Sequence, residues 1–72
     1  MTLVHITATD VVKDDVAIGD NGLPRWRAVE DAVVADGFAR FAIARSDPGP
    51  LTILTITATA ALLVERKPRP FR

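Results

Sequence analysis

The sequence predicts an all-β protein, a small barrel of five or six short antiparallel strands. The first observation behind this is the uncharged segment 51–64, in which apolar residues recur at every second position. That period is typical of a strand with one buried and one solvated face. The second is a series of turns rich in Gly, Pro and Asp, which recur about every ten residues. Because an open sheet this apolar would expose an aggregation-prone edge, we expect the sheet to close.

Size and composition limit what holds this fold together. The chain has 72 residues, nine acidic and nine basic side chains, one histidine and no cysteine. A domain of this size buries only about 60% of the surface of its unfolded chain, so its stability should be marginal. We expect one domain over residues 1–66 and no disulfide or usual zinc site. The segment 51–64 is too short and too rich in threonine to span a bilayer, so we expect a soluble, cytoplasmic protein without membrane contact.

The first 22 residues predict two strands joined by a polar turn. Residues 2–9 alternate, with Val4, Ile6 and Ala8 on one face. Residues 10–15 form the polar turn, whose aspartates we expect in solvent while Val11 returns to the core. Residues 16–18 form a short strand, and the Asn21-Gly22 pair that follows supplies the positive backbone angles of a tight turn.

The middle of the chain leaves strand and helix open. A helix near residues 25–36 is suggested by Pro24, by the helical spacing of Trp26, Val29 and Val33, and by Gly37 as a cap. Against it, Asp36-Gly37 lies between two apolar runs, a strong hairpin signal. This hairpin sets Ala35 opposite Phe38 and gathers a buried face that only Glu30 interrupts, with a bend near Glu30-Asp31. The members of that face are Ala28, Ala32, Val34, Phe41 and Ile43. The strand interpretation is the better supported.

The last third predicts three strands and a tail. Residues 38–45 form a strand, and Ser46-Asp47-Pro48-Gly49-Pro50 forms a turn. A run of 14 residues exceeds the usual strand length, so we expect strands near 51–57 and 61–66 with a break between them. Prolines at alternate positions predict that residues 67–72 form an extended, mobile basic tail.

A resemblance accompanies this pattern. The order Ile6-Thr7-Ala8-Thr9-Asp10-Val11, then Asp15-Val16, then Arg25-Trp26-Arg27-Ala28-Val29-Glu30 resembles small SH3-like β-barrel proteins of actinobacteria and their phages. Asp14-Asp15 stands where those proteins usually have Gly-Asp. The resemblance implies an SH3-like barrel and an actinobacterial or phage origin. It implies no activity, and no functional residue is carried over from it.

The residues needed for catalysis are almost absent. His5 is the one histidine and Ser46 the one serine, and the chain has no cysteine or tyrosine. The glycines form no phosphate-binding loop, and Asp10, Asp14, Asp15 and Asp20 lack the spacing of a calcium loop. We therefore expect no enzymatic activity, no catalytic residue, no metal and no cofactor.

We expect instead a small binding or accessory module that engages a protein partner. Its candidate surface is cationic with two aromatic residues, and comprises Arg25, Trp26, Arg27, Arg40, Arg45, Arg66, Lys67, Arg69 and Phe71. Trp26 belongs either to the core, leaving the arginines as a solvated face, or to the surface, where it can stack on a ligand.

Two further expectations concern partners. The alternative function is weak, sequence-tolerant nucleic-acid binding through Arg25, Arg27, Arg40 and the basic tail, although the neutral net charge does not favour it. The long apolar strand with its threonine row also makes the chain a candidate homo-oligomer that associates by pairing of strand edges.

Overall fold

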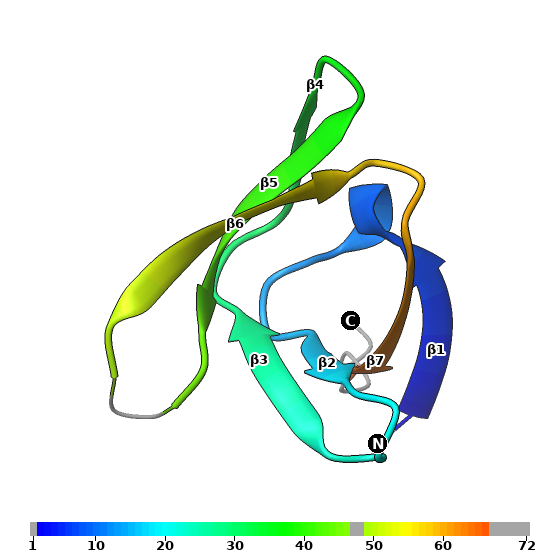
Figure 1. The fold of residues 1–72 in the computed structure, drawn as a ribbon, viewed down its shortest axis with the longest axis vertical. Coiled ribbons are helices and arrows are strands. Elements are labelled where there is room, and N and C mark those ends of the chain that lie inside the picture. The colour runs from blue at the N-terminus through cyan, green and yellow to red at the C-terminus, as the bar shows by residue number, and fades with distance from the viewer. Residues whose placement is uncertain (1, 47–48, 67–72) are drawn as a thin grey trace, which may run out of the picture.

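The computed structural model describes residues 2–46 and 49–66, which contain seven strands and one short 3₁₀ helix. All seven strands belong to one antiparallel sheet, which curls into a half-barrel (Figure 1). The elements are β1 (Thr2–Thr7), η1 (Ala8–Asp10), β2 (Val16–Ile18), β3 (Pro24–Ala28), β4 (Val33–Ala35), β5 (Phe38–Ala44), β6 (Leu51–Thr57) and β7 (Ala61–Arg66). The order across the sheet is β1-β7-β2-β3-β5-β4, and β6 pairs with β5.

The prediction of an all-β fold is confirmed, and the alternative of a helix near residues 25–36 is wrong. This segment contains β3 and β4 instead. The hairpin signal prevails because Asp36 and Gly37 adopt φ angles of 53° and 79°, the left-handed conformation that a tight β-turn requires. The predicted register is also correct, since Ala35 pairs with Phe38 and Val34 with Ala39. The expected closure of the sheet is not seen among the described strands, because β1 pairs with β7 alone and β6 with β5 alone.

The described residues form seven strands, where the sequence predicted five or six. The difference arises between β3 and β4, where the chain leaves the sheet at residues 29–32. Glu30 lies in this bend, and its Oε2 accepts a hydrogen bond of 3.1 Å from the backbone N–H of Ala42 in β5. A side chain thus replaces a backbone partner at the predicted bend, so that β3 and β4 are separate strands.

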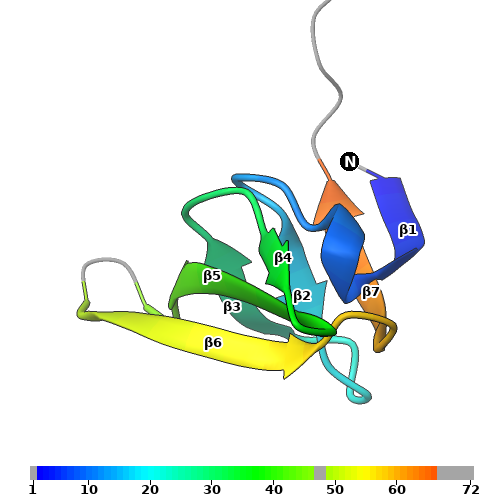
Figure 2. The same cartoon turned by 90° about the horizontal axis from the view of Figure 1, so that it is seen from above.

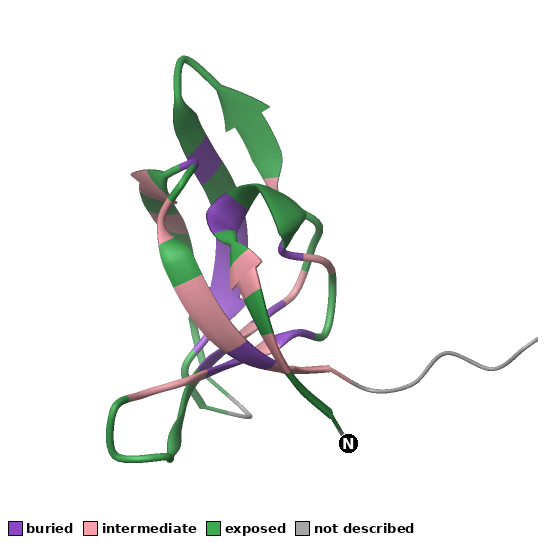
Figure 3. Ribbon diagram, turned by 90° about the vertical axis from the view of Figure 1, so that its right-hand side faces the viewer, coloured by how far each residue is buried: buried purple, intermediate pink, exposed green. Residues whose placement is uncertain are grey.

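The core lies on the concave side of the sheet. Its centre is Phe41, which is fully buried. The centroid of the Phe41 ring lies 5.3 Å from that of the Trp26 ring, and the two ring planes are inclined at 47°. Val11 is 1% exposed, which confirms that it returns to the core from the turn. Figure 3 shows the buried residues gathered inside the curled sheet. The cluster comprises Ala8, Val11, Ala17, Trp26, Ala28, Ala39, Phe41 and Ile43.

Val34 does not join this core, contrary to the prediction. It lies opposite Ala39 in the β4–β5 pair, yet half of its side chain is exposed. The reason is its position, because the β4–β5 hairpin extends beyond the rest of the half-barrel (at the top of Figure 1). Inside the barrel the same face is covered by other strands, and Phe41 and Ile43 on it are fully buried.

Candidate functional site

The convex side of β4, β5 and β6 carries a group of exposed apolar side chains. Directly paired residues of an antiparallel sheet lie on the same face. Phe38 pairs with Thr57 and Ala35, Arg40 with Thr55 and Val33, and Ala42 with Ile53, so these residues share the face opposite the core. We call this the outer face and define it by Val33, Phe38, Arg40, Leu51, Ile53 and Thr55.

The outer face is strongly apolar for a surface. Val33 is 65% exposed, Phe38 50%, Leu51 62% and Ile53 57%. Single exposed hydrophobic residues are normal in soluble proteins, whereas several on one continuous face are typical of an interaction site. Burying such a side chain contributes about 1.5 to 3 kcal/mol, so four of them form a substantial binding surface.

A hollow of about 540 Å³ lies at the β4 end of the outer face. Apolar Val33 and Phe38 line it together with Arg40, and two acidic residues, Glu30 and Asp36, stand at its border. An apolar hollow with a few charged groups can take a partner's side chain and fix its orientation. Of the residues that line this hollow, only Arg40 belongs to the candidate binding surface predicted from the sequence.

The basic residues predicted from the sequence lie in two separate places. Arg25, Arg27 and Arg45 surround a smaller hollow of about 160 Å³ near the β3–β5 contact, where Ser46 also contributes. Arg40 lies on the outer face instead. Arg27 is not an unpaired cation, because its Nη1 lies 3.4 Å from Asp14 Oδ1 in an ion pair on the surface. Of the predicted basic residues that the structure describes, three thus lie around one hollow, and Arg40 lies apart from them.

Arg25 owes its position to a β-bulge. Ala17 pairs with Trp26 and Ile18 with Pro24, so Arg25 is the extra residue that has no partner on β2. A bulge redirects the side chain of its extra residue. The stem of Arg25 packs over Gly19, where a Cβ atom would come within 3.0 Å of Arg25 Cδ. The simple alternation expected for Arg25, Trp26 and Arg27 thus holds for the last two residues only.

Trp26 belongs to the core, since it is only 8% exposed and packs on Phe41. The structure thus shows the first of the two alternatives, in which Trp26 is a core residue and does not stack on a ligand at the surface. The remaining members of the predicted surface, Lys67, Arg69 and Phe71, and the expected tail 67–72 lie outside the described residues.

Arg66 is held by a buried carboxylate, and one third of its side chain is exposed. Its Nε and Nη2 donate to the two carboxylate oxygens of Asp15 at 2.9 and 2.7 Å, and Nη2 also donates to the carbonyl oxygen of Asp10. The hydrogen bond to Asp15 raises the pKa of the Arg66 guanidinium above its ordinary value, against the opposing effect of burial. Asp15 is 1% exposed, so the prediction of a solvated turn carboxylate is wrong at this position.

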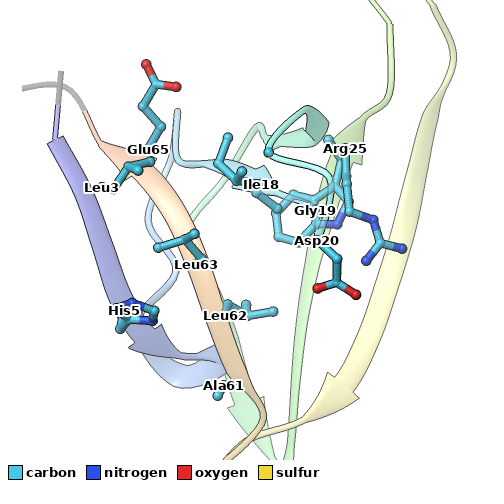
Figure 4. Close-up of a pocket in the computed structure, with 13 residues that line it drawn as sticks. Leu3, His5, Ile18, Gly19, Asp20, Arg25, Ala61, Leu62, Leu63 and Glu65 are labelled. Atoms are coloured by element: carbon cyan, nitrogen blue, oxygen red, sulfur yellow. The ribbon is translucent and has the colours of Figure 1, made fainter.

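A hollow of about 780 Å³ lies between β1, β7 and the turn from β2 to β3. Figure 4 shows His5 on β1, whereas Asp20 and Arg25 lie on the far side of β7. His5 is exposed. Among the described residues, no three His, Cys, Asp or Glu side chains are placed to hold a metal ion. The geometry of this hollow brings no nucleophile, base and orienting group together.

Comparisons with protein-family models, with curated proteins and with solved structures gave no match. Within residues 2–46 and 49–66, no helix is long and apolar enough to cross a membrane. The outer face, on which Val33, Phe38, Leu51 and Ile53 are each at least 50% exposed, is the strongest candidate site on the described surface. The sequence indicated this face, because Phe38 and Arg40 alternate with buried Ala39 and Phe41. From the sequence we instead expected the basic residues to form the candidate surface, which left Phe38 out.

Proposed function

We propose that this protein is a non-catalytic binding module that engages a protein partner through its outer face. The observation that carries the proposal is the concentration of exposed Val33, Phe38, Leu51 and Ile53 on one side of β4, β5 and β6. The curled antiparallel sheet supports an SH3-like barrel as the scaffold. The small number of groups capable of catalysis favours binding over reaction.

The chemistry of the outer face suggests what the partner presents. Phe38 and Val33 offer an apolar hollow, and Arg40 supplies a cation within it. Interfaces gain most of their affinity from aromatic and arginine residues near the centre, surrounded by a polar rim. We expect the partner to insert an apolar side chain next to Phe38 and to place a hydrogen-bond acceptor near Arg40.

The test is capture from a lysate of the native host by the full chain, followed by mass spectrometry. The variant is Phe38→Asp, which places a charge on the outer face at a side chain that is half exposed. The matched control is Leu3→Asp on β1, where the side chain is 58% exposed but lies away from this face. A partner held by the native chain and the control but lost with Phe38→Asp supports the proposal. A partner that both variants retain places the site elsewhere.

Nucleic-acid binding is the second candidate, favoured by the meeting of Arg25, Arg27 and Arg45 around one hollow. Phosphate binding weakens linearly with salt on logarithmic axes, because bound counterions are released. Titration of a fluorescent single-stranded oligonucleotide at several salt concentrations tests it. A steep slope that Arg45→Gln reduces favours this function, whereas no binding at low salt excludes it for that probe.

A further inference from the structure

The free edge of β6 is the feature that the proposed function leaves unused. Among the described strands, β6 pairs with β5 alone (Figure 2 shows it along one boundary of the molecule). An edge strand presents backbone N–H and C=O groups that can pair with another strand. Proteins usually guard such edges with lysine, proline, a bulge or a short strand, and β6 has seven residues with none of these guards.

The hydrogen-bond pattern shows which backbone groups face outward. The N–H of Ala58 donates to the carbonyl of Gly37 at 2.9 Å, and the register Phe38↔Thr57 places these two residues opposite each other. Hydrogen-bonded and non-hydrogen-bonded pairs alternate along an antiparallel ladder. The N–H and C=O groups of Leu51, Ile53 and Thr55 therefore point away from β5.

We propose that a second copy of this chain pairs with β6, so that two half-barrels share one continuous antiparallel sheet. A two-fold axis normal to the sheet places one residue opposite its own copy and keeps each face on its own side. An axis at Ile53 pairs Ile53 with Ile53 and Leu51 with Thr55. Of the four β6 residues whose backbone N–H groups point outward, Leu51, Ile53 and Thr55 are then paired with one another, whereas the carbonyl of the fourth, Thr57, already accepts the N–H of Ala60 at 3.0 Å.

A second copy fits this edge because β6 is self-complementary. The strand has no charged residue, so pairing with itself brings no like charges together, whereas a charged peptide would find no opposite charge on it. Leu51 and Ile53, which are 62% and 57% exposed, flank the pairing edge and would be covered in part by the copy. Chain association thus removes both unpaired backbone groups and apolar surface from water.

β1 and β4 are the competing edges, since among the described strands β1 pairs with β7 alone and β4 with β5 alone, and β4 has only three residues. The N–H of Ala8 donates to the carbonyl of Ala60 at 3.0 Å, in register with the β1–β7 ladder. By the same alternation, Leu3, His5 and Thr7 are the β1 residues whose backbone groups face outward, and pairing about the centre would place the polar His5 side chains of the two copies opposite each other. β6 is longer and has no titratable side chain, so we assign the contact to β6.

The inference does not depend on the proposed function, because edge pairing joins the two outer faces into one surface and covers only part of Leu51 and Ile53. Sedimentation of the full chain over a range of concentrations measures the association. The variant is Ile53→Lys, which opposes two like charges at the axis and should weaken dimerisation at least about tenfold. The matched control is Leu23→Lys in the β2–β3 turn, where the side chain is 61% exposed, and circular dichroism verifies that both variants fold.

A dimer that Ile53→Lys dissociates and Leu23→Lys preserves supports the inference. A monomer at every concentration overturns it, as does a dimer that Ile53→Lys leaves intact. A second readout uses the absence of cysteine from the sequence, because Ile53→Cys then carries the chain's one thiol. Residues opposite each other in such a pair lie about 5.5 Å apart at Cα, within disulfide range. Mild oxidation should cross-link Ile53→Cys chains and leave Leu23→Cys chains unlinked, and equal cross-linking of the two would contradict the register.

Discussion

Asp15 and Arg66 form a bidentate ion pair between residues 51 positions apart in the sequence, with N–O distances of 2.9 and 2.7 Å. Asp15 is 1% exposed, and its Oδ2 also accepts the backbone N–H of Val12 at 3.1 Å. One third of the Arg66 side chain reaches solvent. The pair joins the last residue of β7 to the turn that precedes β2, and so fixes a connection that backbone pairing alone leaves loose.

Removing one member of this pair should destabilise the protein unequally. Arg66→Met leaves a carboxylate buried without its cation, and we expect a loss of about 3 kcal/mol in the free energy of unfolding. Asp15→Asn should cost less, because Arg66 can regain water on its exposed side. Denaturant unfolding of both variants measures the difference.

The surface pair of Asp14 and Arg27 is the internal control. Its atoms lie 3.4 Å apart, and the side chains of Arg27 and Asp14 are 39% and 56% exposed, so Asp14→Asn should change the unfolding free energy by less than about 1 kcal/mol. Asparagine also tolerates the positive φ of 75° at this position. Equal costs for Arg66→Met and Asp14→Asn would show that the buried pair contributes no more than a surface one.

Phe38 and Phe41 lie on opposite faces of β5 and should respond in opposite ways. Phe41 is fully buried against Trp26, and Phe41→Ala should cost about 3 to 5 kcal/mol, enough to unfold much of a small domain. Phe41→Leu is the milder variant if the alanine chain does not fold. Phe38→Ala should change stability by about 0.5 kcal/mol or less. Thermal unfolding followed by circular dichroism distinguishes them, and similar melting temperatures would contradict the assigned faces.

Glu30 tests the bend between β3 and β4. Glu30→Ala removes the acceptor of the Ala42 N–H, and Ala42 is only 7% exposed, so we expect a loss of about 1 to 3 kcal/mol. Glu30→Gln keeps an oxygen at the same place and should retain most of the stability. Hydrogen exchange at the Ala42 amide gives a direct readout, because it should accelerate in Glu30→Ala and not in Glu30→Gln.

Local patterns were sufficient to predict most strands. The alternation of apolar residues places strands near 51–57 and 61–66, and β6 and β7 occupy those bounds. The Asp36-Gly37 turn gives the β4–β5 register, because a tight turn fixes which residues face each other. These features depend on residues that are neighbours in sequence, so the sequence alone contains them.

Contacts between distant segments could not be predicted in this way. Nothing near Asp15 distinguishes it from the other aspartates of its turn, since its partner lies at the far end of β7. The bulge at Arg25 depends on how β2 meets β3, and Val34 is exposed because its hairpin extends past the barrel. The outer face could be predicted only in part. The period of two places Phe38 and Phe41 on opposite faces of β5, but only the sheet order shows that β6 continues the face of Phe38.

Substitutions at Gly37, in the β4–β5 turn, separate the cost of backbone strain from the cost of side-chain contact. Gly37 has φ of 79°, and a methyl group there would meet no atom within 4 Å. Gly37→Ala should therefore lose about 1 kcal/mol through its backbone conformation alone. Gly37→Asn should lose less, because asparagine adopts this conformation more readily. Gly22 has the same φ and the same open surroundings, so Gly22→Ala should cost a similar amount in denaturant unfolding. A much larger loss at Gly37 than at Gly22 would mean that the β4–β5 hairpin supports the barrel beyond its own turn.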